Sequence, residues 1–261
     1  MEKITGKDNK RIKRVIALRD KAKLRRSEGV FIAEGERMVI ETPSLLLKEI
    51  YVSEAYIKEN KKIPGDASNA VIVTDRIMEQ ISDTKTPQGI LAVVKIPTYE
   101  RDDILGRDHK PLVFVLEDVR DPGNLGTIFR TCEGAGVTGI VMTRGCVDLF
   151  SPKVIRSTMG SVFRMPFVFT DSVSETASFL KENNCTCYAA HLGGKKAYDS
   201  FDLTGGTAFF MGNEANGLSD EAAKEADELL LIPMHGRLES LNVAMASGVL
   251  GYEAERQRRN A

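Results

Sequence analysis

The chain has 261 residues, of which 42% are hydrophobic, so it can bury one large core or two ordinary ones. No apolar run reaches the length of a membrane span, and the opening residues, MEKITGKDNKRIKR, lack the apolar stretch of a secretory signal. We therefore expect neither a membrane protein nor a secreted one, and we expect a cytoplasmic location.

Positive charge gathers at the start of the chain, although the formal net charge is only −1. Residues 1–26 carry 11 Lys and Arg against 3 Asp and Glu, which is a net charge of +8. Such a cluster is typical of a surface that binds a polyanion, and a solvated helix face is the alternative. We predict nucleic-acid binding here and assign it to four side chains: Lys10, Arg11, Lys13 and Arg14.

The first part of the chain predicts a small α/β domain over residues 1–96. A basic helix is expected over 5–26, with an apolar stripe of Ile12, Val15, Ile16 and Leu18. Strands are expected at 29–35, 47–53, 70–74 and 88–96, and helices at 36–42 and 75–82. The charged stretch 97–110 lacks periodicity and predicts a linker.

From Pro111 to the end, apolar strands alternate with helices. Strands are expected at 111–119, 138–143, 165–169, 186–192, 207–212 and 228–234. Helices are expected at 124–136, 151–163, 173–183, 218–226 and 240–259. This alternation predicts an α/β domain over 111–261, with a parallel sheet covered on both faces. In such sheets ligands bind beyond the carboxyl ends of the strands.

The cysteines and one glycine motif are assigned structural roles. Cys132, Cys146, Cys185 and Cys187 have no metal-ligand spacing, so we expect buried free thiols and no metal site. The G-x-G-x-x-G pattern of Gly134–Gly139 closes a helix instead of opening one, which argues against a dinucleotide-dependent dehydrogenase.

The first loop that follows a strand of the second domain is DPGN, at 121–124. Asn124 is the predicted N-cap of the next helix. Arg130 falls off the buried stripe of that helix and lies on its polar face. A helix start of this kind can bind a phosphate, and an ordinary cap with a surface arginine is the alternative.

Two later loops also follow strands. GNEANGLS, Gly212–Ser219, places Glu214 just beyond a buried strand, where a carboxylate needs a partner. The loop after Ile232 leads to Ser240, the predicted cap of the final helix. That helix carries several small residues, which allow close packing on a partner subunit or on the chain's own core: Ala244, Ala246, Ser247 and Gly248.

The three loops together resemble the signature motifs of the SpoU (TrmH-type) RNA 2'-O-methyltransferases of the SPOUT superfamily. The matching stretches are NLGTIFRT at 124–131, GNEANGL at 212–218, and IPM with SLNVA within 232–244. Thr158 stands where a serine is expected in an intervening stretch of the family. FIAEGERMVIE and KTPQGILAVV resemble the ends of the family's small substrate-binding domain.

The resemblance implies a C-terminal parallel-sheet SPOUT domain with a trefoil knot, and a homodimer formed through it. It implies S-adenosylmethionine as cofactor, with binding residues Gly212, Ile232, Leu241, Met234 and Leu192. It implies that Arg130 binds the target phosphate or stabilises the developing alkoxide, since a guanidinium is no general base. Four further residues would orient the ribose and the loops: Asn124, Glu214, Ser240 and Asn242. Arg156 is added to the RNA-binding set.

The activity implied is 2'-O-methylation of a ribose in structured RNA, with ribosomal RNA favoured by the two-domain layout. Methylation of transfer RNA is one alternative. A non-catalytic RNA-binding or ribosome-assembly protein on the same fold is another, although the intact motifs favour an enzyme.

Overall fold

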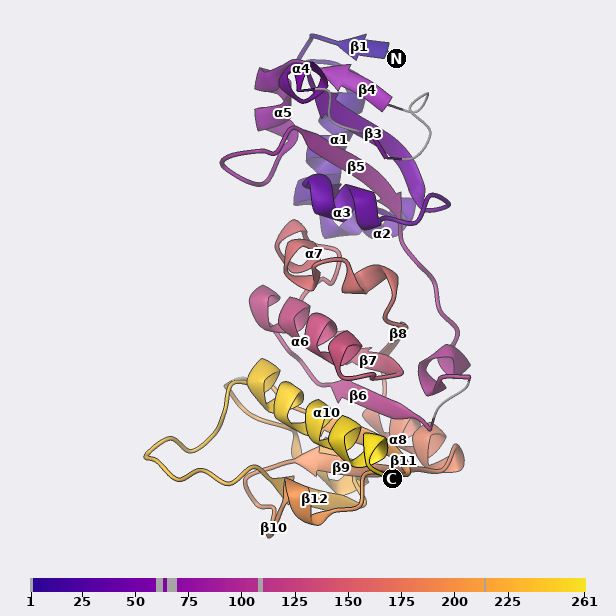
Figure 1. Cartoon of the computed structure of the whole chain (residues 1–261), viewed down its shortest axis with the longest axis vertical. Coiled ribbons are helices and arrows are strands. Elements are labelled where there is room, and N and C mark those ends of the chain that lie inside the picture. Colours follow the sequence, from indigo (N-terminus) through magenta and orange to yellow (C-terminus); the bar gives the residue numbers. More distant parts are fainter. Residues whose placement is uncertain (1, 60–62, 65–69, 108–109, 214) are drawn as a thin grey trace. The chain divides into compact units, whose positions relative to one another are not determined.

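The chain forms two compact units, each built on its own sheet (Figure 1). The computed structural model describes residues 2–59, 63–64, 70–107, 110–213 and 215–261. The first unit consists of residues up to Thr98 together with 148–163, and the second of 99–147 with 164–261. The expected linker therefore joins the second unit from Tyr99 onward, and the stretch 148–163 joins the first.

A mixed five-stranded sheet, in the order β1-β4-β3-β5-β2, forms the first unit. Its strands are β1 (Glu2–Ile4), β2 (Val30–Glu34), β3 (Leu47–Ser53), β4 (Ala70–Val73) and β5 (Ile90–Lys95). Its helices are α1 (Lys10–Asp20), α2 (Ala22–Glu28), α3 (Glu36–Glu41), α4 (Glu54–Lys58), α5 (Asp75–Ile81) and α7 (Pro152–Thr158). The short β1 and α4 were not predicted. The expected helix over 5–26 is two helices, because the backbone at Lys21 is extended.

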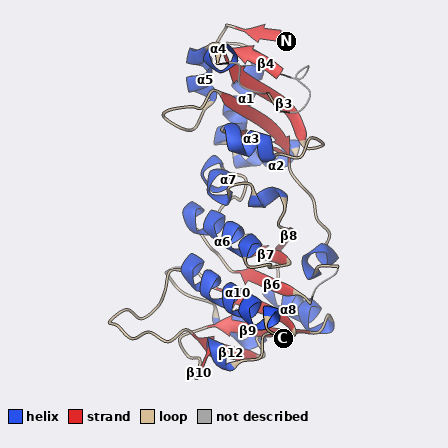
Figure 2. Cartoon of the chain, in the orientation of Figure 1, coloured by secondary structure: helices blue, strands red, loops and turns tan. Residues whose placement is uncertain are grey.

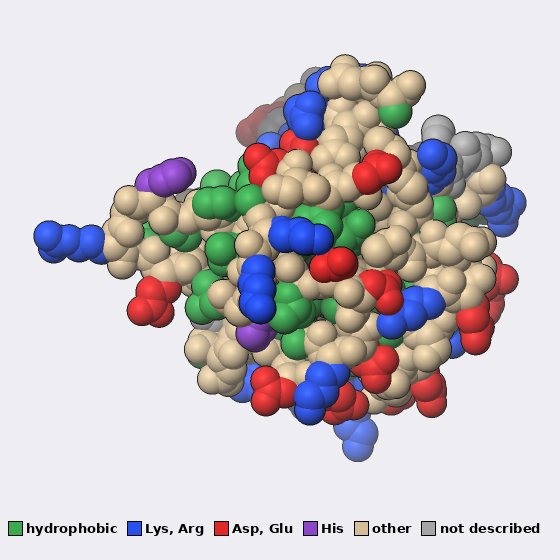
Figure 3. All heavy atoms as spheres, turned by 90° about the horizontal axis from the view of Figure 1, so that it is seen from below, with side chains coloured by type: hydrophobic (Ala, Val, Ile, Leu, Met, Phe, Trp, Pro, Cys, Tyr) green, Lys and Arg blue, Asp and Glu red, His purple; other side chains and the backbone are tan. Residues whose placement is uncertain are grey.

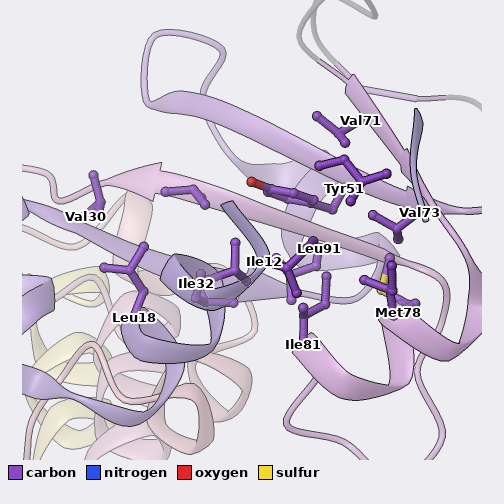
Figure 4. Close-up of a cluster of buried hydrophobic side chains, with 14 residues drawn as sticks. Ile12, Leu18, Val30, Ile32, Tyr51, Val71, Val73, Met78, Ile81 and Leu91 are labelled. Carbon is purple, nitrogen blue, oxygen red and sulfur yellow. The ribbon is translucent and has the colours of Figure 1, made fainter. Parts of the chain in front are cut away.

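The apolar stripe of α1 packs into the main core of this unit (Figure 4). Ile12, Val15 and Leu18 are completely buried there, as the sequence predicts, and Ile16 packs at the edge of the same cluster. Tyr51 of β3 and Ile81 of α5 contribute to it from the other elements. Of the basic residues of α1, Lys10 and Lys13 remain exposed, whereas Arg11, Arg14 and Arg19 are partly buried.

The stretch 148–163 completes a second part of the core of the first unit. The ring of Phe31 on β2 lies 5.3 Å from that of Phe150 and 6.1 Å from that of Phe163, measured between centroids. The guanidinium of Arg25 is buried, pairs with Asp148 and also donates to the Leu18 carbonyl. Paired in this way, a buried charge avoids the penalty of desolvation without a partner.

A seven-stranded parallel sheet, in the order β10-β12-β9-β11-β6-β7-β8, forms the second unit and confirms the predicted sheet. Its strands are β6 (Leu112–Leu116), β7 (Gly139–Thr143), β8 (Phe167–Thr170), β9 (Cys185–Ala190), β10 (Lys196–Ala197), β11 (Gly206–Met211) and β12 (Glu228–Leu231). The two-residue β10 is the strand that the sequence did not indicate.

Helices cover both faces of this sheet (Figure 2). They are α6 (Pro122–Gly134), α8 (Val173–Glu182), α9 (Asp220–Glu225) and α10 (Val243–Arg259). Val113 and Val115 of β6 share a core cluster with residues of α8 and α9. Phe114, between them, points to the other face, where a Cβ added at Gly251 of α10 would lie 3.7 Å from its ring. This alternation is the period of a strand. The knot itself stays a prediction.

The expectation of buried free thiols is confirmed for Cys132, Cys185 and Cys187, but it is wrong for the burial of Cys146. All four are free thiols, and Cys146 alone is only partly buried. Burial raises the pKa of Cys185 to about 11 and that of Cys187 to about 12, so both stay protonated and unreactive at neutral pH.

The glycine pattern behaves as expected too. α6 ends at Gly134, Gly136 has a φ of 70°, and β7 begins at Gly139.

The described residues contain no helix long and apolar enough to cross a bilayer. Among them, no group of three or more His, Cys, Asp or Glu residues is arranged to hold a metal ion.

Candidate active site

A cavity of about 580 Å³ lies at the carboxyl edge of the parallel sheet. The ends of β9, β11 and β12 line it, together with the loop before α10 and the first turn of that helix. Its volume is in the range of small-ligand sites, and its position is the one expected for a ligand of such a sheet. The loop before α10 projects from the unit (Figure 1), and hydrophobic side chains gather beside it (Figure 3).

The turn after β11 closes one wall of this cavity. The Asn213 N–H donates to the Gly217 carbonyl and the Gly217 N–H to the Asn213 carbonyl, both at 2.9 Å. A Cβ at Gly212 would lie 2.1 Å from the Leu218 nitrogen. A side chain at position 212 has no space, because the backbone of the turn itself fills it.

Asn213 is a site residue that the sequence reasoning missed. Its side-chain oxygen accepts from the N–H groups of Ala215 and Asn216, which shapes the turn. Its side-chain nitrogen donates to the Asp118 carbonyl at 2.7 Å, beyond the end of β6. Asn favours such turns because its side chain bonds the backbone two residues on, so its place before a glycine-containing loop was an available signal.

Ser219 is the N-cap of α9, which begins at Asp220, two residues after the expected start at 218. Its hydroxyl oxygen accepts from the Ala222 N–H, and its own N–H and O–H donate to the two Glu117 carboxylate oxygens, each at 2.7 Å. Glu117 thus fixes the far end of the GNEANGLS loop to the end of β6. Glu214 lies outside the described residues, so its predicted role in organising the loops stays a prediction.

Two predicted site residues from distant motifs meet directly. The Asn242 side-chain nitrogen donates to the Asn124 side-chain oxygen at 3.0 Å, across 118 positions of sequence. The Asn242 oxygen also accepts from the N–H groups of Ala244 and Met245, so Asn242, and not Ser240, caps α10. This bond joins the first motif to the third at the N-terminal ends of α6 and α10.

The cap of α6 also differs from the prediction. The helix begins at Pro122, and the Asp121 side chain accepts from the Asn124 N–H, so Asp121 is the N-cap and Asn124 lies in the first turn. Proline favours the first helical position, which leaves the residue before it as the cap. The Asn124 side chain bonds Asn242 instead of capping its own helix.

This bond predicts a measurable coupling between Asn124 and Asn242. We expect a double-mutant cycle of N124A and N242A to give a coupling free energy of unfolding of about 0.5–1.5 kcal/mol. N242A alone should cost about 1 kcal/mol more than N124A, because it also removes a helix cap. Urea unfolding of the four proteins measures this, and additive losses would contradict the coupling.

Arg130 is exposed on α6, on the side away from the buried Leu125, Ile128 and Phe129. Its guanidinium makes no hydrogen bond or ion pair with the described residues. It does not line the cavity. Its charge is thus free for a group that approaches from outside the chain.

The residues expected to bind the cofactor are largely at the cavity. Leu192, Gly212, Ile232 and Leu241 line it, and Met234 does not. Ser240 and Asn242 line it as well.

The residues expected to bind RNA are mostly paired within the first unit. Arg11 and Arg14 both donate to Glu49, at 2.8 Å. Arg156 pairs with Asp83 at 2.7 Å, so its guanidinium also ties α7 to that unit. Among the described residues, Lys13 pairs only with Asp8, and this pair is exposed. Lys10 is exposed, with no ion pair to the described residues. The arginines are thus better explained as structural, while the two lysines remain available.

Comparison with known proteins gives a consistent result for both units. Residues 111–252 match the SpoU rRNA Methylase family, and residues 9–92 match the MRM3-like substrate binding domain. The 23S rRNA (guanosine(2553)-2'-O)-methyltransferase RlmP of Bacillus subtilis is 31% identical over 97% of this chain and 98% of its own length. The human mitochondrial rRNA methyltransferase 3 is 28% identical, over 96% of this chain and 73% of its own.

Solved structures agree with the sequence matches. The AdoMet-bound rRNA methyltransferase of Sinorhizobium meliloti superimposes with a TM-score of 0.84 and 30% identity, over 98% of this chain and 97% of that one. The family match covers more than half of the chain and includes the residues that line the cavity and all three motif loops. The chain belongs to the SpoU rRNA methylase family.

Proposed function

We propose that this protein transfers a methyl group from S-adenosylmethionine to the 2'-hydroxyl of a ribose in ribosomal RNA. The observation that carries the proposal is the meeting of the three motif loops. The second and third line one cavity, and the Asn124–Asn242 bond joins the first to the third. The relatives described above act on ribosomal RNA according to their names, which supports the same class of substrate.

The residues at the cavity fit the cofactor. Leu192, Leu218, Ile232 and Leu241 supply apolar surface suited to a flat base. The backbone of Glu239–Leu241, which lines the cavity, makes no hydrogen bond with the described residues, so its N–H and C=O groups are free to bind ligand polar atoms. When bound, S-adenosylmethionine supplies an electrophilic methyl group on a sulfonium.

Arg130 is assigned to the RNA side of the reaction. A ribose hydroxyl must lose its proton as its oxygen attacks, and a guanidinium cannot accept that proton. It can bind a phosphate with two donors and stabilise negative charge on the oxygen. Its exposure and its lack of a described partner support this role.

The RNA class is tested by methylation with labelled S-adenosylmethionine on 23S rRNA, 16S rRNA and transfer RNA, followed by mapping of the modified ribose. We expect incorporation of label at a single ribose of 23S rRNA. The methyl group at that ribose should be absent from native RNA of a deletion strain. Incorporation into transfer RNA alone would favour the alternative substrate. Binding of RNA without cofactor binding would favour a non-catalytic protein.

The first unit is proposed to supply RNA affinity through exposed basic residues of α1 and α2. Replacing Lys10, Lys13, Lys23 and Arg26 by Ala should lower RNA affinity and flatten its salt dependence, by about one unit of slope for each phosphate that is no longer neutralised. Affinity for S-adenosylmethionine should not change. Fluorescence anisotropy at several salt concentrations measures the RNA affinity, and calorimetry measures that of the cofactor.

The paired arginines provide the matched control for this prediction. Arg11→Ala with Arg14→Ala removes half as many charges but breaks the pairs with Glu49. We expect this variant to have a lower free energy of unfolding and to keep most of its RNA affinity. A larger loss of RNA affinity in this control than in the four-residue variant would contradict the assignment.

We also propose a homodimer through the second unit. The small residues of α10 pack within the chain, since a Cβ added at Gly248 would lie 3.3 Å from Thr131 of α6. Support instead comes from Met245 and Tyr252, which are 61% and 51% exposed. They lie seven positions apart, on one side of α10, where they form an apolar surface that a second copy would cover.

Light scattering on the full chain tests the homodimer. We expect twice the mass of one chain at micromolar concentration, and the mass of one chain for Met245→Lys combined with Tyr252→Lys. Leu45→Lys, at the 92% exposed position of the first unit, is the control and should leave the mass unchanged. A monomeric unmodified protein would refute the proposal.

A further inference from the structure

We propose that His191 binds the adenosine part of the cofactor, by donating a hydrogen bond from its Nε2 atom. The inference rests on the proposed function, because it concerns the same cavity. His191 follows β9 directly and lines the cavity at the carboxyl edge of the sheet. It belongs to none of the three motif loops, and its side chain is half-buried.

Two backbone hydrogen bonds hold the His191 main chain, and a third bond holds its ring. Its N–H donates to the Leu230 carbonyl at 3.1 Å, and its carbonyl accepts from the Gly194 N–H at 2.9 Å. Its Nδ1 accepts from the Gly193 N–H at 3.0 Å. A ring nitrogen that accepts carries no proton, so the neutral imidazole must carry its proton on Nε2.

The two glycines after His191 make this arrangement possible. A Cβ at Gly193 would lie 3.0 Å from Nδ1, and one at Gly194 would lie 2.7 Å from the Leu230 carbonyl carbon. Side chains at either position would push the turn away from the ring or from β12. The sequence HLGG thus builds a rigid donor, and rigid donors lose little entropy on binding.

The Nε2 atom is the polar atom of His191 left without a described partner. Of the other side-chain donors at the cavity, the Asn213 amide donates to Asp118 and the Asn242 amide to Asn124, which leaves the Asn216 amide and the Ser240 hydroxyl in addition to Nε2 of His191. No lysine or arginine is among the described residues that line the cavity. Lone pairs of a bound ligand must therefore be met by neutral donors.

The surroundings of His191 select the adenosine part of the ligand. The His191 N–H donates to the Leu230 carbonyl of β12, so the end of β12 lies near the ring. The apolar residues that line the cavity there are Leu192, Leu230, Leu231 and Ile232. These apolar side chains suit a flat base and give no compensation to a charged amino-acid group. Within the adenosine part, the acceptors are the ring nitrogens of adenine and the oxygens of its ribose.

Calorimetric titration with S-adenosylmethionine, S-adenosylhomocysteine and 5'-methylthioadenosine tests the inference. A ligand that binds too weakly for direct titration is measured by competition. His191→Phe keeps a ring but removes the donor, and should weaken all three ligands by a similar factor, about fivefold to tenfold. His191→Gln places an amide nitrogen near the Nε2 position and should recover part of the loss. His191→Asn, which is too short to reach it, should not.

The outcomes separate this inference from the proposed function. Unchanged affinities in His191→Phe overturn the inference, as does a loss confined to the ligands that carry the methionine part. An unmodified protein that binds S-adenosylmethionine but not 5'-methylthioadenosine at millimolar concentration overturns it as well. Failure to bind S-adenosylmethionine at all overturns the proposed function instead.

Nitrogen-15 spectra of the histidine rings give a readout that needs no folded variant. The chain has three histidines, so the His191 signals can be assigned. We expect the Nε2-protonated tautomer for His191, and a shift of that nitrogen on addition of 5'-methylthioadenosine. The opposite tautomer, or no shift at saturation, contradicts the inference.

Discussion

Arg130→Ala is expected to lower kcat for methyl transfer on the order of a hundredfold or more, with little change in folding stability or cofactor affinity. Arg130 is exposed, and the buried stripe of α6 consists of other residues, so truncation leaves no cavity in the core. It does not line the cofactor cavity either. Single-turnover methylation with labelled cofactor on the cognate RNA measures the effect.

Two further variants give this result its meaning. Arg130→Lys should recover little activity, because an ammonium cannot reproduce the planar donor pair of a guanidinium. Arg256→Ala removes another exposed arginine, near the end of α10. It removes the pair with Glu253 but should leave kcat unchanged. If Arg130→Ala keeps near-normal turnover while RNA affinity collapses, the residue is an RNA anchor and has no part in the chemistry.

Gly212→Ala is expected to cost about 1–3 kcal/mol of folding free energy and to abolish measurable cofactor binding. The added Cβ would lie 2.1 Å from the Leu218 nitrogen and 2.2 Å from the Gly217 carbonyl carbon. Both are backbone atoms of the turn that forms one wall of the cavity, so the turn itself must move. Urea unfolding and calorimetry with S-adenosylmethionine measure the two losses.

Gly236→Ala is the matched control, because it makes the same change in the loop before α10. A Cβ there meets no atom within 4 Å, and we expect both measurements to equal those of the unmodified protein. If Gly212→Ala behaved like Gly236→Ala, the turn would be more adaptable than its backbone contacts indicate.

Local patterns predicted the parallel sheet, because β6 and β11 are apolar runs between amphipathic helices. Very short edge strands such as β10 carry no such pattern and were missed. The cap of α6 was misplaced by three residues, although Pro122 was a readable signal for Asp121.

The sequence alone did not predict which charged residues form pairs. Counting residues 1–26 gave the +8 charge, but Arg11 and Arg14 meet Glu49 only because β3 lies beside α1 in the fold. Likewise, the Asn124–Asn242 bond spans 118 positions, and only the family resemblance placed its two members in one site. Long-range contacts depend on packing, which periodicity does not encode.

The segment 148–163 has a consequence for how such proteins can be recombined. It lies within the stretch that matches the methylase family, yet it packs in the first unit, where Phe150 and Phe163 contact Phe31. The backbone therefore passes between the units three times. A chimera joined near residue 98 would take Phe31 from one protein and the two rings that contact it from another. Exchange of the RNA-binding unit between relatives must carry both segments, so a single crossover cannot transfer its specificity intact.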